Sequence, residues 1–471
     1  MILLASAGIL ALGLLVLTWR SEVWKEPGRW TALAVVGQAA GWQLVRAGKG
    51  VRYEHLALPW QWTGWERWAG FLVLAYGLVV AQAVWTRRAR WLGPLASGGW
   101  RLGVGLLVFG VASTALSPRP LGYGIEMLGR SLVQAAGVGS ALLIGLAMPQ
   151  RLSVVVPRWW PLALGGLTTV ITAAMAVLVY ERHPHVPDEV AYLIQAGYFA
   201  AGKLAIDTPA VPAAFNVDLL YYDAKQIYSV FPPGWPAVLA LGVKAGLAWL
   251  VNPVLAGANV VLCHRLLRAC YDQPTAALGT LLFALSPWHL FFGMSFMSHT
   301  LTLTLAMGAA LLVVGALTTD SWIRLIAAGL LIGGVSLIRP LDGLVLAGTL
   351  GLVVVLAGGK VWHRISQGAI LATATAAAGA LVLPYNAALT GRGSTFPVML
   401  YFNRYYSQGS NDMGFGPNRG LGWSGLDPFP GHGAIDVAVN ALINTFQVNT
   451  ELLGWAAGSL IPILWFFLRP R

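Results

Sequence analysis

The sequence is poor in charged residues, and acidic residues are the scarcest. Of its 471 residues, 18 are Asp or Glu and 30 are Lys or Arg. Charged residues make up 10% of the chain, whereas a soluble globular domain averages about 25%. Hydrophobic residues make up 57%. This composition excludes an ordinary soluble protein and predicts an all-α protein that crosses a membrane many times.

Cysteine is also rare, and several common catalytic motifs are absent. Cys263 and Cys270 would lie about 10 Å apart on one helix, which is too far for a disulfide. The chain has no Ser-His-Asp elbow, no paired-cysteine motif and no nucleotide fingerprint.

The net charge of +12 does not indicate nucleic-acid binding. The basic residues are spread over short loops between apolar runs, as the positive-inside rule describes. Loops with Arg20, Arg88, Arg151, Arg265 and Lys360 would share one side, which we assign to the cytoplasm. The sequence predicts a multi-pass protein of the cell membrane that contacts lipid and no nucleic acid.

Apolar runs of about 20 residues, the length of a membrane helix, recur along the chain. About thirteen candidate spans cover residues 2–18, 30–47, 69–86, 100–116, 132–149, 159–180, 252–270, 274–292, 296–317, 323–338, 342–358, 366–385 and 450–468. The first run has no basic residues before it and no small-residue cleavage site after it. We therefore expect a retained helix there and not a signal peptide.

Two long polar loops, residues 181–231 and 386–449, interrupt the apolar runs. By the charge rule both face outward, so they can build one site together. The segment 233–250 is apolar enough to span but contains Lys244. We expect an interfacial or half-inserted helix there, starting near Pro232.

The chain is predicted to have two parts. Residues 1–150 would form an accessory membrane module of five helices with short loops and little that resembles a chemical site. Residues 151–471 contain both long loops and most of the unusual polar residues. We expect the catalytic membrane domain in this second part.

The most unusual polar stretch is His183–Glu189, with the sequence His-Pro-His-Val-Pro-Asp-Glu directly after an apolar run. Carboxylates at a membrane edge are costly and need a reason. One interpretation is a simple helix start, because Pro187 followed by Asp188 and Glu189 suits a first helical turn. The other is a catalytic pair in which Asp188 is the general base for an acceptor hydroxyl.

The same stretch could hold a metal ion. His185, Asp188 and Glu189 are all possible ligands and lie close together in the sequence. Their spacing does not match a closed structural zinc site. A divalent cation such as Mg²⁺, Mn²⁺ or Ca²⁺, shared with a substrate phosphate, would suit them better. A metal cofactor therefore stays open at this point.

Further candidates lie near the expected outer ends of other runs. Arg339 could bind an anion through its guanidinium fork, or simply pair with Asp342. His299 starts a span and could contact substrate, although a lone histidine more often has a structural role. Tyr192 follows Asp188 by one helical turn and would help to shape the site.

The second long loop mixes aromatic, amide and arginine side chains. Such residues could bind the faces and hydroxyls of sugars, or they could pack as an interfacial lid. The candidates are Tyr385, Asn386, Arg404, Tyr405 and Arg419.

Five short pieces follow one another in a fixed order: Pro187–Tyr192, Phe231–Trp235, Leu282–Pro287, Ile338–Pro340 and Pro384–Gly391. Through their order and spacing, residues 155–450 resemble bacterial integral-membrane glycosyltransferases of the GT-C superfamily. The closer likeness is to the branch of dolichyl-phosphate-mannose protein mannosyltransferases and aminoarabinose lipid A transferases.

This resemblance implies a GT-C-like fold and an inverting transferase of a hexosyl or pentosyl group. The donor would be a polyprenyl-phosphate sugar, and the acceptor a hydroxyl of a glycan, lipid or protein of the cell envelope. The family carries its catalytic aspartate in the first outer loop, which implies Asp188. Its later helix ends bind the donor phosphate, which implies Arg339 and Arg404. One departure is large, because the aspartate loop usually follows the first membrane helix and here follows the sixth.

A transporter or flippase of lipid-linked sugars is the alternative. Many helices with intramembrane Lys244 and Arg339 would suit it. Against it, the sequence shows no paired halves with broken helices, the usual mark of alternating access. A non-catalytic scaffold is a third interpretation, and it requires Asp188 to face lipid or bulk water.

Overall fold

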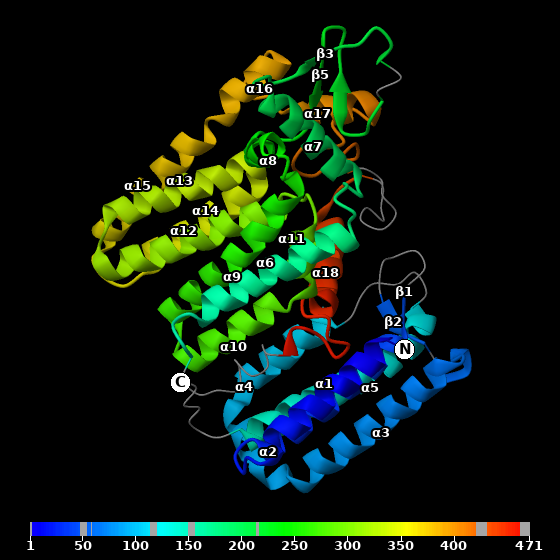
Figure 1. Cartoon of the computed structure of the whole chain (residues 1–471). Coiled ribbons are helices and arrows are strands. Elements are labelled where there is room, and N and C mark those ends of the chain that lie inside the picture. Colours follow the sequence, from blue (N-terminus) through cyan, green and yellow to red (C-terminus); the bar gives the residue numbers. More distant parts are fainter. Residues whose placement is uncertain are drawn as a thin grey trace. The chain divides into compact units, whose positions relative to one another are not determined.

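A computed structural model describes the chain over residues 2–47, 54–57, 59–113, 120–148, 156–212, 216–420 and 431–461. Over these residues most regular structure is α-helical, and the strands are two to four residues long (Figure 1). Contacts divide the chain into two compact units. Unit 1 combines residues 1–153 with 414–471, and unit 2 is the intervening stretch 154–413.

Unit 1 is built from helices near the two ends of the chain. Its elements are α1 (Ile2–Trp19), α2 (Lys25–Gln43), β1 (Val45–Ala47), β2 (Glu54–Leu56), η1 (Pro59–Gln61), α3 (Trp65–Thr86), α4 (Arg88–Ala112), α5 (Pro120–Ala147) and α18 (Ala434–Glu451). Helices α2, α3 and α5 share a polar contact: the Tyr76 hydroxyl lies 2.8 Å from Ser140 Oγ and accepts from Gln38 Nε2 at 3.4 Å. Such contacts join helices inside a membrane.

The C-terminal segment joins unit 1 through side-chain amide groups. Asn449 on α18 donates to Ala112 O at 3.1 Å and to Ser113 Oγ at 3.2 Å. Gln38 Oε1 accepts from Ala457 N at 2.6 Å. We predicted one domain over residues 151–471, but the structure groups residues 414–471 with the N-terminal helices. The buried amide of Asn449 finds its hydrogen-bond partners among those helices.

The expected span 450–468 is not a continuous helix. Helix α18 ends at Glu451, and bends and turns occupy most of the following nine residues. Within them Leu453 N donates to Ser459 Oγ at 2.9 Å, and Leu460 N donates to Asn449 Oδ1 at 2.9 Å. The rest of that expected span, from residue 462, lies outside the described residues.

Unit 2 contains most of the residues that we singled out from the sequence. Its elements are α6 (Trp160–Leu178), α7 (Pro187–Ala200), β3 (Ile206–Asp207), β4 (Leu220–Tyr222), β5 (Gln226–Ser229), α8 (Gly234–Lys244), η3 (Ala248–Leu250), α9 (Val251–Cys270), α10 (Gln273–Ala284), α11 (Pro287–Met294), α12 (His299–Thr319), α13 (Trp322–Ile338), α14 (Pro340–Leu356), α15 (Val361–Gly379), α16 (Val382–Thr390) and α17 (Pro397–Tyr405). The strands form an antiparallel sheet in the order β3-β5-β4.

Six helical segments of the described residues are long and apolar enough to cross a membrane. They are Trp65–Thr86, Gly129–Ala147, Trp160–Leu178, Ala248–Cys270, His299–Thr319 and Val361–Thr390. Helices α10 and α11, bent by 52° at a short break, would add a seventh. Helices α13 and α14 are apolar but have 17 residues each. The chain is therefore an all-α membrane protein, and by length and composition fewer helices qualify than the thirteen spans we expected.

The expected helix near Pro232 is α8. It has 11 residues, or about 17 Å at 1.5 Å per residue, which is too short for a hydrocarbon core of about 30 Å. The 3-10 turn η3 then leads directly into α9. Segment 233–250 therefore does not span as one helix.

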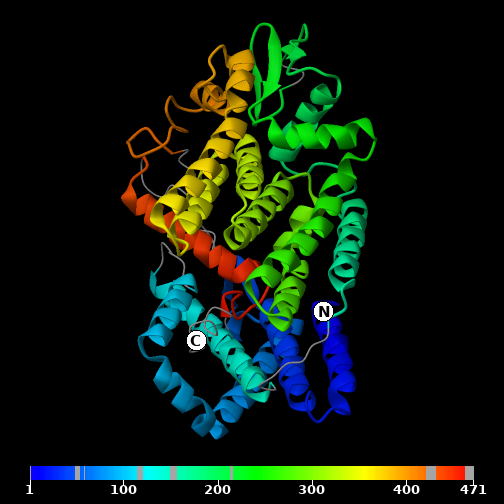
Figure 2. The same ribbon diagram turned by 90° about the vertical axis from the view of Figure 1, so that its left-hand side faces the viewer.

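The two long connections of unit 2 meet at one end of its helices (Figures 1 and 2). The Tyr401 hydroxyl on α17 accepts from Leu219 N at 3.2 Å, and Gln226 Nε2 donates to Leu389 O at 3.3 Å. These contacts agree with the expectation that both loops face one side. They concern the second loop only up to residue 413, where unit 2 ends. The short turns near residues 272, 320 and 358 lie at the opposite helix ends.

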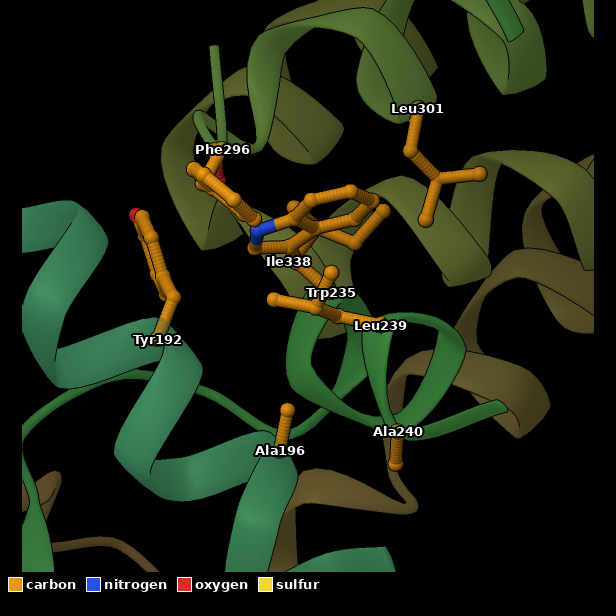
Figure 3. Close-up of a cluster of buried hydrophobic side chains, with 8 residues drawn as sticks. All are labelled: Tyr192, Ala196, Trp235, Leu239, Ala240, Phe296, Leu301 and Ile338. Atoms are coloured by element: carbon orange, nitrogen blue, oxygen red, sulfur yellow. The ribbon is translucent and has the colours of Figure 1, made fainter. Parts of the chain in front are cut away.

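A hydrophobic cluster lies where this end begins (Figure 3). It consists of Tyr192, Ala196, Trp235, Leu239, Ala240, Phe296, Leu301 and Ile338. The Trp235 ring is 1% exposed, and its Nε1 donates to Phe296 O at 2.9 Å. A Cβ on Gly234 would lie 2.8 Å from Leu337 O, so only glycine lets α8 start directly against the end of α13.

Candidate functional site

A strained turn brings the chain from α6 to α7. Glu181 and Arg182 have φ angles of 49° and 61°, the left-handed region that non-glycine residues rarely adopt. Arg182 N donates to Ala176 O at 2.9 Å, and the Arg182 guanidinium lies 5.2 Å from the centre of the Trp249 ring. These contacts stabilise a sharp reversal that places the start of α7 beside the end of α6.

Helix α7 starts as the sequence indicated, with Pro187 in its first turn followed by two acids. The helix-start interpretation therefore describes the local structure correctly. It is compatible with a catalytic role for Asp188, because a residue in the first turn of a helix can also be a base. Asp188 is half-buried. Burial raises the pKa of Asp188 above its ordinary value, while its own backbone N–H and the nearby Arg339 guanidinium oppose that rise. A carboxylate that is partly exposed, beside a cation, and has a raised pKa suits a general base.

Glu189 has a different environment from its neighbour and is 0% exposed. Its Oε1 accepts from Phe296 N at 3.0 Å and lies 3.5 Å from the Tyr180 hydroxyl, which donates to it. Its Oε2 accepts from His185 N at 2.8 Å. We predicted Glu189 as a catalytic residue with Asp188; its carboxylate is enclosed and hydrogen-bonded, which suits a residue that positions other groups.

Arg339 links two apolar helices. It is the last residue before Pro340, with an extended backbone between α13 and α14. Its Nε donates to Asp342 Oδ2, and its Nη1 lies 3.4 Å from His299 Nε2. The local ion pair with Asp342 is therefore present. The charge of Arg339 still acts on Asp188, which lies about 150 residues earlier in the chain.

Tyr192 and His299 join the same group of side chains. The Tyr192 hydroxyl lies 3.4 Å from Ser298 Oγ, directly before His299. Burial raises the pKa of Tyr192 to about 12, so its hydroxyl keeps its proton at neutral pH. The structure thus brings together four residues from three parts of the sequence: Asp188, Tyr192, His299 and Arg339.

The segment Ser295–Ser298, between α11 and α12, is the hub of this arrangement and was not predicted from the sequence. Asn252 Nδ2 donates to Ser295 O at 2.7 Å and to Met297 O at 2.8 Å. Glu189 and Trp235 bind the backbone of Phe296, between these two residues. Irregular backbone at a membrane edge is tolerated only when protein groups satisfy it. The available signal was a polar residue, Asn252, in an apolar run.

Tyr385 and Asn386 are structural in their contacts. The Tyr385 hydroxyl donates to Phe231 O at 3.2 Å and accepts from Gln195 Nε2 at 2.9 Å. Asn386 is 0% exposed, and its Nδ2 donates to Gly393 O at 3.1 Å. Tyr385 joins α16 to α7 and to the loop before α8, whereas Asn386 holds the turn that follows α16.

Arg404 and Tyr405 belong to a second cluster, on the sheet. Arg404 Nη1 donates to Tyr222 O, and its guanidinium lies 5.3 Å from the centre of the Tyr221 ring and 5.5 Å from that of Tyr405. Tyr405 is 44% exposed. The contacts of Arg404 are with the sheet and α17, and Arg339 is the arginine that acts on Asp188.

Arg419, the last predicted contact residue, falls in unit 1. Its side chain lies beside Gly416, where a Cβ would be 3.4 Å from Arg419 Nε. It therefore belongs to a different unit from Asp188.

The expected metal ligands do not form a metal site. Among the described residues, which include all three, no group of three or more His, Cys, Asp or Glu side chains could hold an ion. His185 Nε2 lies 3.1 Å from Tyr180 O, and its ring packs on Tyr180 at 4.3 Å. Glu189 is occupied by its own donors. His185, Asp188 and Glu189 therefore do not converge as three ligands in this structure, because His185 and Glu189 contact other partners.

No family model, no curated protein and no solved structure matches the chain. Its likeness to GT-C enzymes therefore rests on the short sequence pieces alone. The site offers a half-buried carboxylate and a held arginine at one end of a helical membrane unit, which together can remove a proton and stabilise a phosphate.

Proposed function

We propose that unit 2 is a glycosyltransferase that moves a sugar from a polyprenyl-phosphate donor to an acceptor hydroxyl. The observation that carries the proposal is that a half-buried carboxylate, Asp188, lies near enough to Arg339 for the guanidinium charge to lower its pKa, at the loop-bearing end of the helices. A base and a phosphate-binding cation are the two charged groups that this reaction needs. A lipid donor suits a site at the end of apolar helices, where the tail can remain in the membrane.

The division into units supports the same assignment. In the GT-C enzymes that the sequence resembles, the aspartate loop usually follows the first membrane helix. Counted along the whole chain, the Asp188 loop follows the sixth helix, α6, but α6 is the first helix of unit 2. On this proposal unit 1 is an addition to a GT-C-like unit, which would account for the large departure from the family pattern.

The proposed reaction is a single inverting displacement. Asp188 takes the proton of the acceptor hydroxyl, and the oxygen attacks the anomeric carbon from the face opposite the phosphate. The bond from that carbon to the phosphate oxygen breaks, and the phosphate leaves with the electron pair. Arg339 stabilises the charge that develops on it, and Tyr192 donates a hydrogen bond within the site.

The outer face of the membrane is the proposed location of this chemistry. Arg265, Arg268, Lys360 and Arg364 lie near the helix ends opposite to Asp188. Basic residues concentrate on the cytoplasmic side, so the end with Asp188 would face outward.

Asp188→Asn tests the proposal because it keeps the shape and removes the base. The purified protein is reconstituted with a panel of radiolabelled polyprenyl-phosphate pentoses and hexoses, with cell-envelope extract as acceptor. We expect the transfer rate to fall by about 10³-fold while donor binding persists. Asp207→Asn is the matched control, since the Asp207 side chain is 97% exposed, and it should retain the wild-type rate.

The outcome also separates an enzyme from a carrier. The labelled donor is presented only in the outer leaflet, and both sugar transfer and lipid movement are followed. Movement to the inner leaflet without transfer would support a flippase instead. A folded Asp188→Asn protein that transfers sugar near the wild-type rate would refute the role of this residue as base.

A further inference from the structure

Two neighbours hold the guanidinium of Arg339. Its Nε donates to Asp342 Oδ2, and its Nη1 lies 3.4 Å from His299 Nε2. Arginine has no acceptor atom, so His299 Nε2 accepts and the imidazole is neutral with its proton on Nδ1. Over the part of the chain that the structure describes, no hydrogen bond engages Nη2 of Arg339. The guanidinium therefore has one nitrogen still available.

His299 is itself held in place. Its ring stacks on Phe292 with centroids 4.3 Å apart and an interplanar angle of 20°. Ser298, the preceding residue, lies 3.4 Å from the Tyr192 hydroxyl through its Oγ. Tyr192 stands one turn after Asp188 on α7. Ser298 and His299 therefore connect α7, which carries the proposed base, to the arginine that would bind phosphate: Ser298 contacts Tyr192, and His299 contacts Arg339.

We infer that His299 is a positioning residue that orients Arg339 for the donor phosphate, with Asp342 holding the guanidinium from its other side. A free arginine side chain loses rotamer entropy when a ligand orders it. An arginine already held at Nε and Nη1 presents Nη2 to a phosphate oxygen at a smaller loss. This inference rests on the proposed function and names how the donor is bound.

His299 acts through Arg339 and does not itself touch the donor. Its Nδ1 is buried and has no hydrogen-bond partner among the described residues. An enclosed atom of this kind does not reach a ligand in this conformation. The imidazole therefore contributes through the orientation of Arg339.

The test uses the full chain in nanodiscs, with undecaprenyl phosphate as the probe and its dissociation constant as the readout. His299→Leu removes the acceptor and should weaken binding about tenfold, or about 1.4 kcal/mol. His299→Gln restores a side-chain acceptor and should remain within about threefold of the wild type. His363→Leu, at the opposite helix ends of unit 2 where His363 pairs with Asp320 at 2.7 Å, is the control and should leave the constant unchanged.

A double-mutant cycle separates positioning from general damage to the fold. In an Arg339→Gln background, His299→Leu should have no further effect on the dissociation constant, because the residue it positions is gone. An equal tenfold loss in that background, or no rescue by His299→Gln, would overturn the inference. If the protein binds the lipid phosphate but transfers no sugar, the transferase proposal fails and the cycle still decides on His299. If it does not bind the probe, both fail.

Discussion

Asp188 and Glu189 are adjacent carboxylates whose surroundings give them different roles. Glu189 is enclosed by hydrogen-bond donors, whereas Asp188 is half-exposed and under the influence of Arg339. Two acids with different environments can divide structural and chemical work between them. Glu189 faces the protein interior, where donors already occupy its oxygens, whereas Asp188 is partly exposed and can accept a proton from a ligand.

The pKa of Asp188 predicts the acid limb of the pH profile. A general base works in its ionised form, so activity should rise as pH increases through this pKa. Burial raises the pKa above the ordinary value of 3.8, so the midpoint of that limb should lie at a higher pH. Arg339→Gln removes a cation that lowers the pKa, and the midpoint should move to still higher pH.

The measurement is kcat/KM for sugar transfer as a function of pH, for the wild type and Arg339→Gln. A midpoint that stays the same in both proteins would contradict the coupling between these residues. The same pKa bears on stability: the folded state holds the Asp188 proton more tightly than the unfolded state does. The contribution of Asp188 to the free energy of unfolding therefore falls as pH rises through its folded-state pKa. The pH dependence of activity should be measured together with a check that the protein stays folded.

The elements around the site depend on one another through Glu189. Its carboxylate joins the start of α7 to the turn after α6 and to the segment before α12. The short helix α8 joins the same segment through Trp235. Four parts of the chain therefore meet at one side chain and at the backbone of Phe296.

Glu189→Gln should destabilise the protein by about 3 kcal/mol, because the amide presents N–H groups to groups that are themselves donors. For a unit of this size the thermal midpoint should fall by roughly 5–10 °C. Tryptophan fluorescence during heating measures the change. Glu181→Gln, the same substitution at an exposed position of the preceding turn, should change stability by less than about 0.5 kcal/mol. Equal midpoints for the two variants would show that Glu189 is not a structural anchor.

At the scale of the molecule, unit 2 has its long connections at one end and its short, basic turns at the other. This arrangement predicts which side of the membrane each end faces. Asp207, at the loop-bearing end, should be accessible from outside the cell, and Lys360, in a short turn, from the cytoplasm. Both residues are exposed, so each can report on its compartment.

The experiment replaces Cys263 and Cys270 by Ser and then introduces Asp207→Cys or Lys360→Cys. A membrane-impermeant maleimide should label the first variant in intact cells and the second only after permeabilisation. The reverse pattern would place the end with Asp188 in the cytoplasm and would remove the argument for a lipid-linked donor.

Local features were accessible from the sequence to different degrees. Hydropathy predicted most apolar helices, and Pro232 marked the region where α8 begins, because these signals depend on residues close together. The contact of Arg339 with His299 was not predicted, since about 40 residues separate them. The hub at Ser295–Ser298 was missed because Asn252, which binds it, lies about 40 residues away on another helix. Up to residue 461, where the described residues end, the expected C-terminal span is not a continuous helix, because Asn449 and Ser459 accept hydrogen bonds from backbone groups of the bends and turns that follow α18.

The sequence by itself determined that this protein is an all-α membrane protein, because hydropathy and the scarcity of charge act locally along the chain. It also placed two acids in the first turn of a helix. Tertiary structure decided that Glu189 is buried while Asp188 stays partly exposed, and that Arg339 acts on Asp188. It also decided that residues 414–471 join the N-terminal helices. Burial and charge coupling depend on which distant segments pack together, and neighbouring residues in the sequence do not contain that information.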